Sequence, residues 1–236
     1  MGLLSDVLAV QSKSGKCERM ASFVISKGKA LAGVRVETDQ IGNIYMTKGE
    51  LDQNEEYPAF ACHIDTVHNI NENYKILRTP KSHVWFAYDK SNGDRLGIGG
   101  DDKCGIYVAI KLLEKLDKVK CAFYVDEEIG CVGSKTSDLT FFNDCRWIVQ
   151  VDRKGNGDII YNGAGTEFCS HEFKAAVSKI GEKFDYSPTT GYVTDVKALK
   201  DRGLDISVIN ISAGYYDPHR ECETIVEKDL LNAFNY

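Results

Sequence analysis

Along this chain, the pattern of hydrophobic and polar residues alternates between one typical of buried β-strands and one typical of α-helices. Apolar runs such as YPAFACHID and WIVQVD are typical of buried strands, whereas apolar residues at Ile106, Ile110 and Leu113 recur at helical spacing. The pattern predicts strands at 34–39, 43–49, 57–65, 83–89, 95–100, 121–125, 147–151 and 205–212. It predicts helices at 3–10, 18–31, 106–116, 167–184 and 226–234, with a short helix starting at Thr194 or Asp195.

Strands that take turns with helices are typical of an α/β protein with a mostly parallel sheet. The sequence therefore predicts a three-layer α/β/α sandwich. We found no internal repeat, low-complexity tract or linker that would divide the chain, so residues 1–236 are expected to form a single domain.

Composition narrows the function classes. The chain has 29 Lys and Arg against 35 Asp and Glu, a net charge of −6, so the basic face that nucleic-acid binding needs is not expected. No apolar run approaches the roughly 20 residues of a membrane span, and the start MGLLSDVLAVQSKSGK does not fit a signal peptide. The eight cysteines contain no CxxC pair, which favours reduced thiols and a cytoplasmic location.

Candidate metal ligands lie at or just after the ends of predicted strands, apart from one histidine near the C-terminus. In open α/β sheets, ligands bind at this edge, so residues far apart in sequence can meet there. The candidates are His63, Asp101, Glu128, Asp152 and His219. Two imidazoles and three carboxylates suit two divalent ions, Zn²⁺ first, with Co²⁺ or Mn²⁺ as alternatives. Glu127 is then left over as a general base.

These motifs together resemble those of the co-catalytic dizinc exopeptidases. This superfamily includes the zinc aminopeptidases, the tripeptidase (peptidase T) type and the glutamate carboxypeptidase type. GIGGDDKCGI and VDEEIGCVGS are most similar to the tripeptidase and its relatives. SVINISAGYYDPHRECETI is similar to the closing motif of the aminopeptidase branch. The similarity covers nearly the whole chain, and the combination is far more specific than any single motif.

The resemblance implies a role for each residue. His63 and Asp152 would bind the first metal, Glu128 and His219 the second, and Asp101 would bridge both. Glu127 would be the general base, and Asp65 would hydrogen-bond the ring of His63. The resemblance also implies a cis peptide bond between Asp101 and Asp102, with Asp102 serving as a helix-start or supporting residue.

Tripeptidase and carboxypeptidase relatives carry a large domain inserted between the positions of Asp152 and His219. Here only about 65 residues separate the two, too few for such a domain. A second insertion point, between His63 and Asp101, is expected to hold only a small hairpin. The chain therefore resembles a bare catalytic domain, which favours an aminopeptidase acting on short peptides. Any oligomer would form without an inserted dimerisation domain.

Several other residues have competing interpretations. Tyr192, in GYVTD, resembles a tyrosine that donates to the oxyanion, although an ordinary packing role is about equally expected. Tyr215 and Tyr216 are alternatives that would line the substrate pocket. Asp195 is expected to cap a helix, with support of a ligand as the alternative. The remaining histidines lack the ligand pattern and are expected at the surface: His68, His83 and His171.

Two other functions remain open from the sequence. The same site would serve an N-acyl amino-acid deacylase or another small-amide hydrolase. A compact domain without an insert could also be a catalytically inactive binding module. The intact Glu127 argues against the second alternative, because a degenerate relative would be expected to lose its base or a ligand first.

Overall fold

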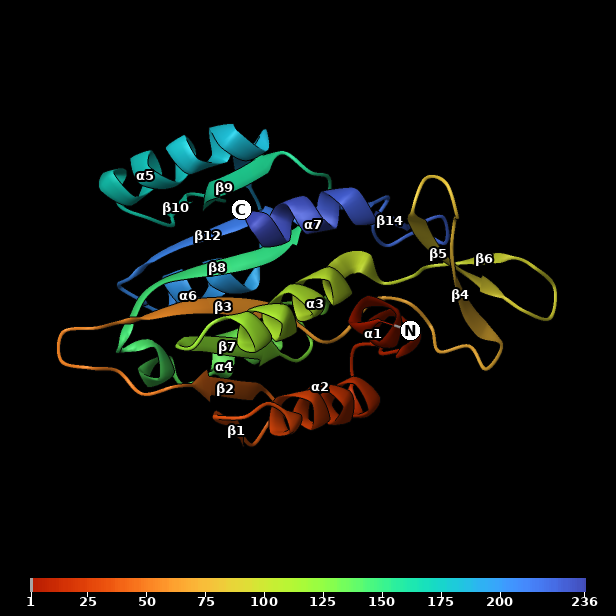
Figure 1. Ribbon diagram of the computed structural model, residues 1–236, viewed down its shortest axis with the longest axis horizontal. Helices are drawn as coiled ribbons and strands as arrows, with labels where there is room; N and C mark the ends of the chain where they lie inside the picture. The colour runs from red at the N-terminus through yellow and green to blue at the C-terminus, as the bar shows by residue number, and fades with distance from the viewer. Residues whose placement is uncertain (1) are drawn as a thin grey trace.

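A large mixed sheet forms the centre of the computed structural model, which describes residues 2–236. Within these residues the sheet has nine strands, ordered β1-β2-β7-β3-β8-β12-β9-β10, with β11 paired to β9 (Figure 1). The strands are β1 (Val34–Thr38), β2 (Ile44–Lys48), β3 (Tyr57–His63), β7 (Val119–Tyr124), β8 (Cys145–Arg153), β9 (Asp158–Gly163), β10 (Thr166–Glu167), β11 (Ser187–Gly191) and β12 (Ser207–Ser212).

The four middle strands β7, β3, β8 and β12 run parallel to one another. Their apolar runs follow from this position, because strands buried on both faces need apolar residues pointing both ways. Every residue of β7 is buried. The outer pairs β1–β2, β2–β7, β12–β9 and β9–β10 are antiparallel. The prediction of a mostly parallel sheet thus holds for the middle of the sheet, where the candidate ligands lie.

Helices cover both faces of the sheet, which confirms the predicted three-layer sandwich. Their bounds are α1 (Leu3–Ala9), α2 (Glu18–Ala30), α3 (Gly100–Lys115), α4 (Val132–Thr136), α5 (His171–Gly181), α6 (Asp195–Asp201) and α7 (Glu227–Asn235), with 3₁₀ turns at Leu139–Phe142 and Glu182–Phe184. Helices α2, α3 and α7 lie in front of the sheet in Figure 1, and α4 and α6 lie behind it. Ile106, Ile110 and Leu113 of α3 pack against β3 and β7, as their spacing predicted.

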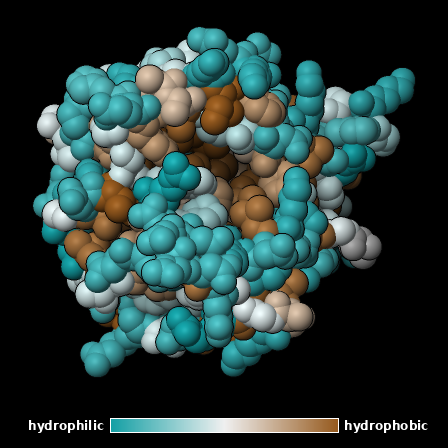
Figure 2. Space-filling view, turned by 60° about the vertical axis from the view of Figure 1, so that its left-hand side comes forward, coloured by the Kyte–Doolittle hydropathy of each residue, from teal (hydrophilic) through white to brown (hydrophobic). Residues whose placement is uncertain are grey.

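Apolar residues are exposed around a hollow on one side of the molecule (Figure 2). A cavity of about 490 Å³ lies between α3, α5 and α7, lined by residues such as Leu112, Trp147 and Phe173. Across residues 2–236, every helix is too short or too polar to serve as a membrane span.

A second, five-stranded sheet stands beside the main one. It is ordered β13 (Tyr215–Tyr216), β14 (Thr224–Val226), β5 (Val84–Asp89), β4 (Tyr74–Arg78), with β6 (Arg95–Leu96) also paired to β5. The predicted β5–β6 hairpin is present, but the stretch between His63 and Asp101 holds more than a hairpin because β4 also pairs with β5. The C-terminal β14 pairs with β5 on its other side. Ala87 and Ile225 of this sheet share a buried cluster with Val149 of β8, so the core is continuous between the two sheets.

The helix predicted over 167–184 was too long. Glu167 belongs to strand β10, where it pairs with Asn162 of β9. The helix begins only at His171, because the side chain of Ser170 caps it by accepting the backbone amide of Phe173. Strands β4, β9, β10, β11, β13 and β14 were not predicted. Pro188 is tolerated in β11 because this strand lies at an edge and pairs only with β9.

Candidate metal centre

The five candidate ligands meet at the carboxyl edge of the parallel strands. His63 is the last residue of β3, and Asp152 lies near the end of β8. Glu128 follows β7, and Asp101 lies in the first turn of α3. His219 lies in the loop between β13 and β14. The strand order places β3 between β7 and β8, so these ends are neighbours.

Asp101 lies between the two histidines. Its Oδ1 is 3.0 Å from Nε2 of His63, and its Oδ2 is 3.3 Å from Nε2 of His219. One carboxylate therefore faces two imidazoles with different oxygens, as the bridging role requires. The Asp101–Asp102 peptide bond is cis, as predicted.

Each histidine also has a carboxylate of its own. Nε2 of His63 is 3.7 Å from Oδ1 of Asp152, and Nε2 of His219 is 3.0 Å from Oε2 of Glu128. The other oxygen of Glu128, Oε1, is buried and has no hydrogen-bond partner among the described residues. A buried carboxylate oxygen without a donor is costly unless a cation lies beside it.

Electrostatics also favour cations here. Burial alone would lower the pKa of His63, but its bonds to Asp101, Asp152 and Asp65 raise it well above the usual value. Hydrogen bonds to Asp101 and Glu128 raise the pKa of His219 to about 10. Burial, followed by the charge of Asp101, raises the pKa of Asp152 well above its usual value. Carboxylates packed this closely favour a positive charge beside them.

The donor set fits divalent metal ions. Zinc bonds to nitrogen and oxygen are about 2.0–2.2 Å long, which puts tetrahedral ligand atoms roughly 3.4 Å apart, and the four distances above lie between 3.0 and 3.7 Å. His63, Asp101 and Glu128 also place donor atoms within 4.8 Å of one another. The residues present therefore match what an ion of this kind needs.

Asp102 lies close to the cluster but is already satisfied. Its donor atom is within 4.8 Å of those of His63 and Asp152. However, Oδ2 accepts the backbone amide of His63 at 3.2 Å, and Oδ1 accepts that of Gly105 at 2.9 Å. Both oxygens hold the ends of two elements together, which fits a supporting residue better than a ligand.

Asp65 contacts the ring of His63, as expected, and supports the site in a second way as well. The His63 ring lies 3.1 Å, through Nδ1, from the backbone carbonyl of Asp65 and 3.4 Å from its carboxylate. The carboxylate also accepts the backbone amides of Glu127 at 2.9 Å and Glu128 at 3.2 Å, and the hydroxyl of Ser14 at 2.7 Å. Asp65 therefore fixes the segment that carries both glutamates.

The two adjacent glutamates point to different partners. Glu128 faces His219, whereas Oε1 of Glu127 accepts a hydrogen bond from the thiol of Cys131 at 3.3 Å. Burial raises the pKa of Glu127. A carboxylate of raised pKa outside the ligand pairs is what a general base requires.

The two tyrosine positions differ. Tyr192 lies after β11 with 81% of its surface exposed, and its hydroxyl forms no hydrogen bond with the five candidate ligands. Tyr215 is buried, and its hydroxyl donates to Oδ1 of Asp152 at 3.3 Å. Tyr215 is thus the tyrosine that the fold brings to the cluster.

Sequence reasoning also missed a buried pair beside the ligands. His68, expected at the surface, has a side chain only 18% exposed and lies 2.8 Å from the fully buried carboxylate of Glu223. His83 and His171 are exposed, as predicted. The only signal in the sequence for the buried His68–Glu223 pair was the position of Glu223, four residues after His219.

Asp195 is buried and accepts the hydroxyl of Ser134 at 2.6 Å, so it does not cap α6 through its side chain.

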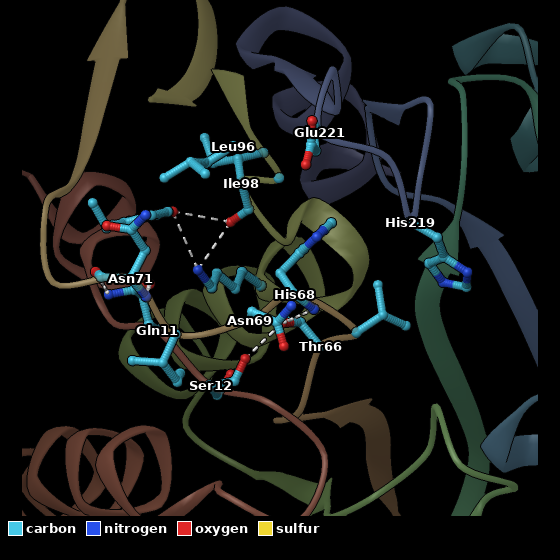
Figure 3. A pocket seen from close by; sticks show the side chains of 15 residues that line it. Gln11, Ser12, Thr66, His68, Asn69, Asn71, Leu96, Ile98, His219 and Glu221 are labelled. Carbon is cyan, nitrogen blue, oxygen red and sulfur yellow. Dashed lines mark hydrogen bonds between the residues drawn. The ribbon is translucent and has the colours of Figure 1, made fainter. Parts of the chain in front are cut away.

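A cavity of about 430 Å³ opens beside His219. Figure 3 shows His219 and Glu221 on one side and Gln11, Ser12 and Asn71 on the other. Ser12 is buried, and its hydroxyl has no partner among the described residues. The cavity is large enough to receive part of a peptide at the candidate metal centre.

Comparison with known proteins identifies the family. The family model described as M42 glutamyl aminopeptidase matches residues 90–235, more than half of the chain. The chain belongs to this family. It is therefore a metal-dependent aminopeptidase that acts on peptides. No curated protein matched this M42 peptidase in a sequence search.

Solved structures share the fold at low identity. Aminopeptidase PepT from Bacillus cereus is 14% identical with a TM-score of 0.71, covering 98% of this chain and 94% of that chain. The TET1 peptidase of Pyrococcus horikoshii is 19% identical with a TM-score of 0.70, covering 98% and 96%. An aminopeptidase from the archaeon Desulfurococcus kamchatkensis is 18% identical with a TM-score of 0.72, covering 99% and 91%.

Proposed function

We propose that this M42 aminopeptidase uses two Zn²⁺ ions and releases the N-terminal residue of short peptides. His63 and Asp152 hold the first ion, Glu128 and His219 hold the second, and Asp101 is shared. The observation that carries this proposal is the position of Asp101, whose two oxygens face two different imidazoles at 3.0 and 3.3 Å. We further propose that residues 1–236 form one catalytic domain, because one buried cluster spans both sheets.

Two such ions, when bound, lower the pKa of water and polarise a peptide carbonyl. Glu127 takes the proton of the attacking water on its carboxylate and passes it to the departing amine. Asp65 keeps Glu127 in place through the backbone amide at 2.9 Å. Tyr215 holds Asp152 through the bond at 3.3 Å, so that the carboxylate stays directed at His63.

Two further parts of the proposal concern how the protein self-associates and where in the cell it lies. The TET1 peptidase assembles into a tetrahedron or a large octahedral shell, as its description states. For this chain we propose that any self-association uses the surface of the catalytic domain, because the stretch between β3 and α3 holds only β4, β5 and β6. All eight cysteines are free, which supports a cytoplasmic location.

Matched peptides test the proposal. Zinc-loaded protein is incubated with tripeptides that carry a free amino end, with their N-acetyl forms and with C-terminally amidated forms. We expect release of the first residue from the free and amidated peptides and none from the acetylated ones. Faster cleavage of the acetylated peptides would favour a deacylase, and no turnover of any peptide would favour a binding module. Glu127→Gln is the control for a contaminating peptidase.

A further inference from the structure

A buried glutamate outside the five candidate ligands lies directly behind Asp101. Glu223 immediately precedes β14, four residues after His219, and it is fully buried. A carboxylate shielded from water is costly unless donors surround it. The groups that donate to Glu223 therefore show what this residue does.

Two of its three donors are backbone amides of the segment that carries Asp101. Oε2 accepts the amide of Gly99 at 2.7 Å, and Oε1 accepts the amide of Asp101 itself at 3.1 Å. The two oxygens thus hold two amides at the start of α3, one at its N-cap Gly99 and one in its first turn. The position of the Asp101 carboxyl group depends on this backbone, because only rotation about the Cα–Cβ bond separates the backbone from the carboxyl carbon.

Glu223 is itself held from the second sheet. Arg95 donates from Nη2 to the backbone carbonyl of Glu223 at 3.2 Å, and the amide of Glu223 donates to the carbonyl of Arg220 at 3.1 Å. The next strand, β14, pairs with β5 through Ile225 and Trp85. The backbone of Glu223 is therefore held in place, and its carboxylate in turn holds the backbone at Asp101.

His68 completes the arrangement. Its Nε2 is 2.8 Å from Oε2 of Glu223, and its ring forms part of the wall of the cavity beside His219 (Figure 3). The ring lies against Gly97, where an added Cβ would come within 1.9 Å of Cε1 of His68. Only glycine at position 97 leaves room for the ring in this position.

We propose that Glu223 is a positioning residue for the metal centre, with His68 as its partner. Glu223 sets the backbone of Asp101 so that one carboxylate faces both His63 and His219. It touches neither the candidate metals nor the substrate. The inference rests on the proposed function, because it assumes that Asp101 bridges two ions.

The test compares metal affinity in matched variants. Glu223→Gln keeps the size of the side chain but turns one acceptor oxygen into a donor, which opposes a backbone amide. Loss of a partner behind a ligand typically lowers metal affinity by about 10–100-fold. We expect a loss of this size in calorimetric titration of the metal-free protein with Zn²⁺, and recovery of turnover when Zn²⁺ is raised. Glu72→Gln, an exposed site, is the control.

His68→Gln and Gly97→Ala give a second, milder perturbation. Both leave Glu223 in place and remove or displace its side-chain partner, so we expect a smaller loss of Zn²⁺ affinity. Hydrogen exchange at the Asp101 amide should quicken in each variant. If Glu223→Gln does not fold, these two variants decide the question.

The outcomes separate the inference from the proposed function. If wild-type protein binds fewer than two ions or cleaves no peptide, the proposed function fails. If wild-type protein binds two ions and the Glu223→Gln, His68→Gln and Gly97→Ala variants bind them with unchanged affinity, only the positioning role fails. A lowered unfolding temperature with unchanged affinity would likewise mean that Glu223 only stabilises the fold.

Discussion

The adjacent glutamates offer the sharpest prediction, because substitution of each by glutamine should give a different result. Glu128 lies 3.0 Å from His219, and its buried Oε1 has no hydrogen-bond partner within residues 2–236. Glu127 touches Cys131 instead. Asp65 holds both backbone amides, so neither substitution should move the segment. Any difference between the two variants must therefore come from the side chains.

The size of each effect follows from these contacts. Glu127→Gln keeps the hydrogen bond from Cys131 but cannot accept the proton, so turnover should fall by roughly 10²–10⁴-fold. This corresponds to about 3–5 kcal/mol of activation free energy. Its metal content should stay at the wild-type value. Glu128→Gln replaces a charged carboxylate ligand with a neutral amide, so the second ion should bind at least about 10–100-fold more weakly.

The assay pairs single-turnover peptide cleavage with elemental analysis of the same samples. Raising Zn²⁺ should restore much of the activity of Glu128→Gln and none of that of Glu127→Gln. If Glu127→Gln lost metal and Glu128→Gln lost only turnover, the two roles would have to be exchanged. If both variants kept full turnover and metal, neither glutamate would belong to the site.

Two further perturbations test the ligand set and the charge around it. Asp101→Ala should lower the occupancy of both metal sites, whereas His219→Ala should chiefly lower that of the second site. Elemental analysis that shows the loss of only one ion from Asp101→Ala would argue against a bridging role for Asp101. Burial, then the charge of Glu127, raises the pKa of Asp195 from its ordinary 3.8 to about 8. The folded protein then keeps a proton that the unfolded chain has lost, so this stability is present below pH 3.8 and is lost as pH rises through about 8. In urea titrations of metal-free protein, Asp195→Asn should lose less stability than wild type between about pH 5 and 9, a difference on the order of a few kcal/mol; equal losses would contradict the assignment.

Much of the fold could be predicted because its local patterns agree with its tertiary structure. The central strands are apolar on both faces, and α3 carries its apolar residues at helical spacing, so both were recognisable in the sequence. The errors occurred where tertiary pairing decides the structure. The short strand β14 pairs with β5 from the first half of the chain, and the edge strand β11 pairs with β9 across helix α5, so separated segments supply their hydrogen bonds.

The sequence by itself determined which chemistry this protein can carry, because residue types and their places at strand ends are local properties. It supplied two imidazoles, the carboxylates and the adjacent glutamates. Only the tertiary structure decided how they support one another. Glu223 and His68 are 155 positions apart, and Tyr215 and Asp152 are 63 apart. Such pairs leave no periodic trace in the chain, since their hydrogen bonds exist only after two sheets have packed against each other and excluded water.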